Sequence, residues 1–391
     1  MREESERREI RGYHAVRSAA KDTEMYSSDL IGDRDTRTYK QVPLEYDPPL
    51  HTVFRQAVSP LFMSQNIEPK APEFERLARR LIRDLTERGG GDLARDLALP
   101  YVMGCLAVIY NRPQDVEEWI SWGPDVWTAE AYRSGIIGAG QSDSGLADGV
   151  RSGAVLEGYL DRVFSSAHPS PGGHPATTDV WDWIAGLDID GRPLTRDEMY
   201  GIANVLLAGG RDTVIKLITG LAWHLTMSPA DRTFLTENRG ACNAAIAEMV
   251  RFLSPLPKIE RVLPDDRGIP IPDRDPRDYV LINYRSANHD RTIWPNPDVI
   301  DIHRPRIPHL AFGFGRHSCM GMNITEYEAR AFLTALLDDW PHWEFDGEPR
   351  LEWNTEGEGE ESVTVIASFA RVRVRPRSGT HAATAGVPGQ A

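Results

Sequence analysis

One ten-residue segment constrains this chain more than any other, the run FGFGRHSCMG at residues 312–321. The glycines that precede Cys319 allow positive φ angles and a close approach of the backbone to a flat ligand. A helical pattern follows the segment, so free N–H groups and the positive end of a helix dipole should lie near the sulfur. Such surroundings stabilise a thiolate. We therefore interpret Cys319 as a ligand rather than as a structural cysteine in a glycine-rich turn.

The other cysteines argue against a shared site. Cys105 and Cys242 lie far from Cys319 and from each other, and the chain has no C-x-x-C pair. This spacing does not favour a disulfide framework or a tetrahedral zinc site. A single functional thiolate is the reading that remains.

Charge and hydropathy narrow the class of protein. The 391 residues carry a formal net charge of −14, which argues against nucleic acid as a partner. No stretch reaches the length of apolar sequence that a transmembrane helix needs, so we expect no membrane partner. The first residues are mostly charged and lack the apolar core of a signal peptide. We therefore expect a cytoplasmic protein.

Apolar periodicity predicts a mainly α fold with small β-sheets. Thr195 and Glu198 form a capping-box pattern that opens a long helix, although Gly209 and Gly210 are costly in its interior. We expect one domain over residues 1–375 and a disordered tail over 376–391. The predicted helices are 72–87, 93–110, 195–227, 242–253 and 326–338, and the predicted strands are 279–284 and 363–374.

The cysteine segment resembles the haem-binding loop of the cytochrome P450 family, and the similarity extends from about Tyr13 to Arg375. The resemblance implies the cytochrome P450 fold and haem b as the cofactor. It implies that Cys319 is the ligand of the iron and that Phe312 and Gly313 lie against the haem.

A second segment carries the chemistry expected on the oxygen side of such a haem. Glycines at 209 and 210 leave room for a small ligand, and Asp212 next to Thr213 can relay protons. Taken alone, the segment is equally well explained as a kinked helix with a solvated aspartate. Beside the cysteine loop, it resembles the oxygen-binding helix of the family, which assigns Asp212 and Thr213 as catalytic.

Four basic residues match the positions that bind the haem propionates in the family. They are His51, Arg55, Arg261 and His317. Arginine and histidine donate charge-assisted hydrogen bonds to carboxylates. Each one alone is explained more simply as a surface cation, but together they favour the propionate role.

Another matching set is expected to serve folding rather than catalysis. Glu248 and Arg251 are one helical turn apart and resemble the family's E-x-x-R pair, which Arg304 would join. The segment Ser286–Asp290 resembles a further structural motif, in which His289 replaces the usual arginine.

Two departures from the family stand out. His51 lies close to the start of the chain, so we expect the N-terminal elements of the fold to be shortened. Glu326 occupies a position where the family commonly has a base, which puts partner docking on that face in doubt.

The expected substrate contacts are small or apolar. Val205, Ala208 and Gly209 lie one or two turns before Thr213 on the same face, and Ile259 matches another family wall. A small hydrophobic or aromatic substrate follows from these side chains.

The resemblance implies a monooxygenase that inserts one atom of O₂ into a C–H bond, by hydroxylation or O-dealkylation. Electrons are expected from a ferredoxin and its NAD(P)H-dependent reductase, docking near Arg316 and Met320. Two alternatives remain open. One is a haem-thiolate enzyme that uses peroxide or catalyses coupling or dehydration, against which the Asp212–Thr213 pair argues. The other is a non-catalytic haem-binding protein.

Overall fold

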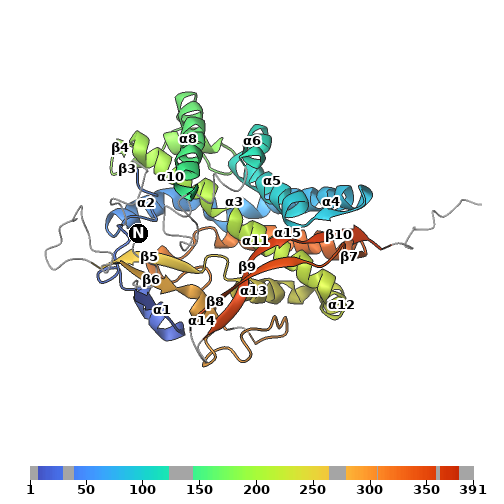
Figure 1. The fold of residues 1–391 in the computed structure, drawn as a ribbon. Coiled ribbons are helices and arrows are strands. Elements are labelled where there is room, and N and C mark those ends of the chain that lie inside the picture. The colour runs from blue at the N-terminus through green and yellow to red at the C-terminus, as the bar shows by residue number, and fades with distance from the viewer. Residues whose placement is uncertain are drawn as a thin grey trace, which may run out of the picture.

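The computed structural model describes residues 8–29, 39–122, 144–263, 279–305, 307–357 and 362–377. Helices form most of the molecule, and the sheets between and beside them are small (Figure 1). Helix α11 runs through the middle, between a group of helices that includes α4, α5 and α8 and the part that holds the longer strands (Figure 1). The predicted class, mainly α with small sheets, is confirmed.

The helices differ widely in length. They are α1 (Tyr13–Ala19), α2 (Leu50–Val58), α3 (Ser64–Ile67), α4 (Ala71–Glu87), α5 (Leu99–Tyr110), α6 (Val116–Ser121), α8 (Ser144–Ser165), α9 (Val180–Ala185), α10 (Arg196–Gly209), α11 (Asp212–Met227), α12 (Pro229–Glu237), α13 (Cys242–Leu253), α14 (Tyr284–Asn288) and α15 (Met322–Asp338).

The strands are short, and they pair in four small sheets within the described residues. The first sheet has the order β1-β6-β5, the second β2-β10-β7, and the other two are the pairs β3-β4 and β8-β9. The strands are β1 (Arg8–Ile10), β2 (Gly91–Asp92), β3 (Asp188–Ile189), β4 (Arg192–Pro193), β5 (Lys258–Val262), β6 (Tyr279–Asn283), β7 (Trp343–Phe345), β8 (Arg350–Glu356), β9 (Val363–Arg371) and β10 (Arg373–Pro376).

The prediction of one long helix over 195–227 is wrong. The structure has two helices, α10 and α11, joined by Gly210 and Arg211. The predicted capping box is present, because Thr195 accepts from the Glu198 N–H and Glu198 accepts from the Thr195 N–H. The break falls beside the glycine pair, where a helix interior is least stable.

Both ends of the described chain contain a strand residue that the sequence did not predict. Strand β1 precedes α1 and pairs in parallel with β6, so a sheet strand exists where none was expected. At the other end Pro376, predicted to lie in the tail, pairs with Trp343 in the second sheet. Residues 378–391 of that tail lie outside the described part of the chain.

One buried carboxylate fixes the region between α13 and the cysteine segment. Arg251 donates from Nε and Nη2 to Glu248, both at 2.8 Å, and Arg304 Nε donates to the same carboxylate at 3.1 Å. Arg251 also donates to the carbonyl oxygens of Asn288 and Pro297 at 2.8 and 3.0 Å. These contacts support the predicted structural role of the three charged residues.

Candidate active site

The segment 312–321, called the cysteine loop below, is held by its own backbone. The Cys319 N–H donates to the Phe312 carbonyl at 2.7 Å, and the Gly313 N–H donates to the Leu310 carbonyl at 2.9 Å. Gly313 and Gly315 have φ angles of 69° and 75°, which side chains other than glycine rarely adopt. The sequence places glycines where the loop needs them, and α15 begins directly after it at Met322.

Helix α1 supports the loop from outside. A Cβ atom at Gly315 would lie 2.8 Å from the Ala20 carbonyl oxygen, so only glycine allows this approach. The Arg17 guanidinium lies 4.6 Å from the centre of the Phe314 ring, and the Lys21 ammonium lies 5.3 Å from it. Two cations therefore cover the outer face of this ring.

The Cys319 side chain is exposed although it lies deep within the protein. Burial raises the pKa of its thiol, while the Gly321 N–H and the charge of Arg55 lower it. The two properties agree if the accessible surface of the sulfur faces a hollow inside the molecule. Among the described residues, no group of three or more His, Cys, Asp or Glu side chains could hold a metal ion.

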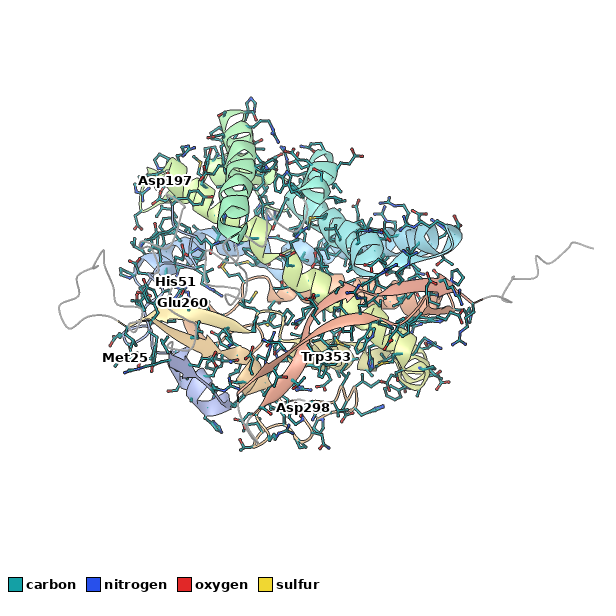
Figure 2. All side chains as sticks on the ribbon, viewed as in Figure 1. Met25, His51, Asp197, Glu260, Asp298 and Trp353 are labelled. Carbon is teal, nitrogen blue, oxygen red and sulfur yellow. The ribbon has the colours of Figure 1, made fainter. Side chains whose placement is uncertain are left out.

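Basic side chains gather beside the cysteine loop. The rings of His51 and His317 lie 4.1 Å apart between their centroids, and Arg55 Nη2 donates to the Ser318 carbonyl at 2.7 Å. Figure 2 shows His51 and Glu260, the neighbour of Arg261 in β5, in the same region, and the charge of Arg261 acts on His51.

Burial and the surrounding cations keep these histidines neutral. They lower the pKa of His51 to about 4, through burial, Arg55 and Arg316, and that of His317 to about 2, through burial and Arg261. Within the part of the chain that the structure describes, neither ring nitrogen of His51 has a hydrogen-bond partner, although the side chain is buried. Buried polar atoms are normally paired, so this cluster is suited to a bound anion.

A groove of about 340 Å³ opens between α2 and the cysteine loop. His51, Arg55 and Arg316 are among the residues that line it, together with Gln56 and Ser318. The basic edge is therefore reachable from the surface.

The junction of α10 and α11 forms the other half of the site. Thr213 Oγ1 donates to the Gly209 carbonyl at 3.1 Å, and a Cβ atom added at Gly209 would meet nothing within 4 Å. The Asp212 side chain is 40% exposed, yet burial raises its pKa. Gly209 thus borders open space, with the Thr213 hydroxyl bonded to its carbonyl and the partly exposed Asp212 carboxylate at the same junction.

The two halves are connected through the core. Helix α11 packs against α15, which follows the cysteine loop. Arg211 is the residue whose role the sequence did not reveal, since nothing in the pattern tells which way it points. The structure buries Arg211 and joins its Nη1 to Asp212 Oδ1 at 2.5 Å.

The predicted substrate contacts fall in two places. Val205 and Ala208 in α10 are half-buried, and Gly209 at its end is exposed. Ile259 is buried in β5 and belongs to a smaller core cluster with Ile282 and residues of α1. These assignments stay predictions.

Comparisons with known proteins agree on one family. The family profile described as cytochrome P450 matches residues 238–352. Cytochrome P450 109 of Bacillus spizizenii is 28% identical over 75% of this chain and 71% of its own. A steroid C26-monooxygenase of Mycobacterium tuberculosis is 25% identical over 84% of this chain and 85% of its own.

The fold is also similar to that of solved structures. A solved structure described as a carbohydrate active P450 superposes with a TM-score of 0.77, and the match covers 96% of this chain and 93% of that one at 23% identity. Within the described residues, no helix has the length and apolar character that crossing a membrane requires.

Proposed function

Because the chain belongs to the cytochrome P450 family, as a bacterial-type member and monooxygenase that binds haem b, we propose that it oxidises a C–H bond of a small hydrophobic or aromatic molecule. The reaction takes one oxygen atom from O₂ and is a hydroxylation or an O-dealkylation. The observation that carries the proposal is the pair of half-sites, the cysteine loop and the α10–α11 junction, on helices that pack together.

The residues present fit a haem. Cys319 offers an accessible sulfur, Gly209 leaves open space, and the unpartnered His51 nitrogens can receive an anion. In the proposed site Cys319 ligates the iron, while His51, Arg55, Arg261 and His317 hold the propionates and Phe312 and Gly313 lie against the ring. Bound in this way, a haem-thiolate group supplies the activation of O₂ and the cleavage of its O–O bond.

The protein's own contribution on the oxygen side is proton supply. Asp212 borders this space with a carboxylate whose pKa is raised by burial above its ordinary value, which favours the uptake of a proton. Thr213 shares that border, and its hydroxyl is tied to the Gly209 carbonyl. We assign Asp212 as the group that exchanges protons and Thr213 as the hydroxyl that passes them on.

Substrate choice rests on Val205, Ala208, Gly209 and Ile259, which offer apolar surface and no charge. Since one relative is named as a steroid monooxygenase, a ligand screen should include steroids beside small aromatic ethers and phenols. Displacement of water from the iron by a true substrate shifts the ferric Soret band, so the screen detects a substrate before its product has been identified.

Electrons in this proposal come from a ferredoxin and an NAD(P)H-dependent reductase, which places the protein in the cytoplasm with them. The net charge of −14 would repel an acidic donor from most of the surface. Arg17, Lys21 and Arg316 gather around the cysteine loop, so an acidic partner is best received there.

The first test is spectroscopic. The reduced protein with CO should show the long-wavelength Soret band of a thiolate-ligated haem, and Cys319→Ala should lose it. Cys242→Ala is the matched control, because Cys242 is a buried thiol in α13 away from the loop. A Cys319→Ala protein that keeps the band refutes the ligand assignment.

The second test separates the reaction classes. Turnover with NAD(P)H and O₂ that falls in Thr213→Ala supports the proposal. Turnover of the wild type with peroxide but not with NAD(P)H and O₂ supports a peroxide-using enzyme instead. A screen with neither turnover nor spectral shifts supports a non-catalytic haem protein.

A further inference from the structure

The α10–α11 junction holds a buried arginine directly beside the carboxylate assigned to proton exchange. Arg211 is 3% exposed, and its Nη1 donates to Asp212 Oδ1 at 2.5 Å. Within the described residues, Arg211 is the charged group that acts on this carboxylate. The sequence neighbour of the acid is therefore also its counter-ion.

Burial and Arg211 act on Asp212 in opposite directions. Burial raises the pKa of the carboxyl, whereas Arg211 lowers it through its charge and its hydrogen bond. An arginine side chain stays protonated at all pH values of interest, so its field is permanent. A group that must both gain and lose a proton in every turnover works best with a pKa near the operating pH.

We propose that Arg211 is a positioning residue for the reaction, which holds the Asp212 carboxylate beside Thr213 and keeps it able to exchange protons. The inference rests on the proposed function, in which Asp212 supplies protons to oxygen. A neutral side chain at position 211 leaves the partly buried carboxyl without its cation, and the pKa of such a carboxyl rises. The Asp212 carboxyl then gives up its proton too slowly to support O₂-driven turnover.

The overall reactions show why two oxidants distinguish this role. With O₂, the substrate RH, two electrons and two protons give ROH and water, so protons must be delivered. With hydrogen peroxide, RH and H₂O₂ give ROH and water, and the oxidant already carries both protons. Arg211 should therefore matter for the first reaction and not for the second.

The experiment compares holoprotein variants Arg211→Leu, Arg211→Lys and Asp212→Asn. The control is Arg196→Leu, which removes an exposed ion pair with Asp161 at the start of α10. Infrared spectra of protein labelled with ¹³C-aspartate follow the carboxyl titration, and the band lost in Asp212→Asn identifies Asp212. Turnover is measured across pH with NAD(P)H and O₂, and separately with peroxide.

We expect the Arg211→Leu carboxyl to titrate at higher pH than in the wild type. Its O₂-driven turnover at neutral pH should fall about 10–100-fold, with the pH profile shifted the same way. Arg211→Lys should restore part of the rate, and peroxide-driven turnover should stay within about twofold.

Two results overturn the inference. One is an Arg211→Leu protein with the wild-type carboxyl titration and pH profile. The other is an equal loss of both oxidant-driven activities with a disturbed CO spectrum, which marks a purely structural residue. Full O₂-driven turnover in Asp212→Asn would instead refute the proton role of Asp212 in the proposed function, while the infrared titration would still report on Arg211.

Discussion

Replacing Glu248 by glutamine removes the one negative charge shared by Arg251 and Arg304. Both oxygens of this carboxylate accept hydrogen bonds from these arginines, and one of them also accepts the Asp301 N–H at 3.0 Å. The Glu248 and Arg251 side chains are 5% and 1% exposed. The substitution keeps the size of the side chain, so its effect is electrostatic and does not create a cavity.

The magnitude follows from what is left behind. Breaking a buried ion pair from one side costs about 3–5 kcal/mol, because the remaining charge stays buried without its partner. Arg251 keeps its hydrogen bonds to the carbonyls of Asn288 and Pro297, which favours the lower end of that range. A loss of about 3 kcal/mol is a large part of the roughly 5–15 kcal/mol that stabilises a typical protein.

Urea unfolding of the holoprotein, followed by far-UV circular dichroism, measures this loss. The midpoint should fall by about 1 M for a slope on the order of 3 kcal/mol per molar urea. The matched control is Glu73→Gln in α4, because Glu73 and Arg76 repeat the spacing at 3.8 Å with side chains that are 54% and 73% exposed. An exposed pair contributes little, so this midpoint should not move. Equal midpoints for the two variants would refute the reasoning.

Three further predictions follow from single contacts. Burial lowers the pKa of His289 to about 3, whereas an unfolded imidazole titrates near pH 6.5, so its stabilising contribution is present above about pH 6.5 and is lost as the pH falls toward 3. Stability should drop by about 2–3 kcal/mol between about pH 6.5 and 4.5, and urea midpoints of His289→Gln should lack this slope. Gly315→Ala should lower both the melting temperature and the haem content of the protein. The control Gly347→Ala has a similar positive φ, but its added Cβ meets nothing within 4 Å, so it should lower the melting temperature only by the backbone strain. Equal melting temperatures of the two variants would count against the close approach at Gly315. His51→Phe should speed the transfer of haem to apomyoglobin several-fold and Thr52→Val should not, and identical transfer rates would contradict the propionate role of His51.

Local sequence patterns predicted most helices, because the apolar residues of one helix face recur at a regular spacing within a short segment. The predicted helix over 242–253 agrees with α13, and the capping box of Thr195 and Glu198 opens α10 where expected. Strand β1 was missed, since its three residues carry no alternation that can be read locally. Its partners are far along the chain, and Glu9 accepts a hydrogen bond from Asn283, 274 residues away.

The candidate site likewise has a part that the sequence predicted and a part that it did not. The motif around Cys319 identified the residue types, because glycines and a following helix start are visible in sequence. The relation of Arg211 to Asp212 was not visible, since neighbouring residues in a broken helix can point in many directions. Only the packing of the junction determines that the guanidinium turns inward and pairs with the acid.

The pairing of β1 with β6 also sets the order in which the chain can fold during synthesis. Strand β1 leaves the ribosome before β6, and its partner follows only after the 274 residues that separate Glu9 from Asn283. At a synthesis rate of about 5–20 residues per second, β1 remains without its partner β6 for on the order of 10–60 s. The cysteine loop is made later still, so a nascent chain reaches its cofactor-binding state only after both strands of this pair have been synthesised.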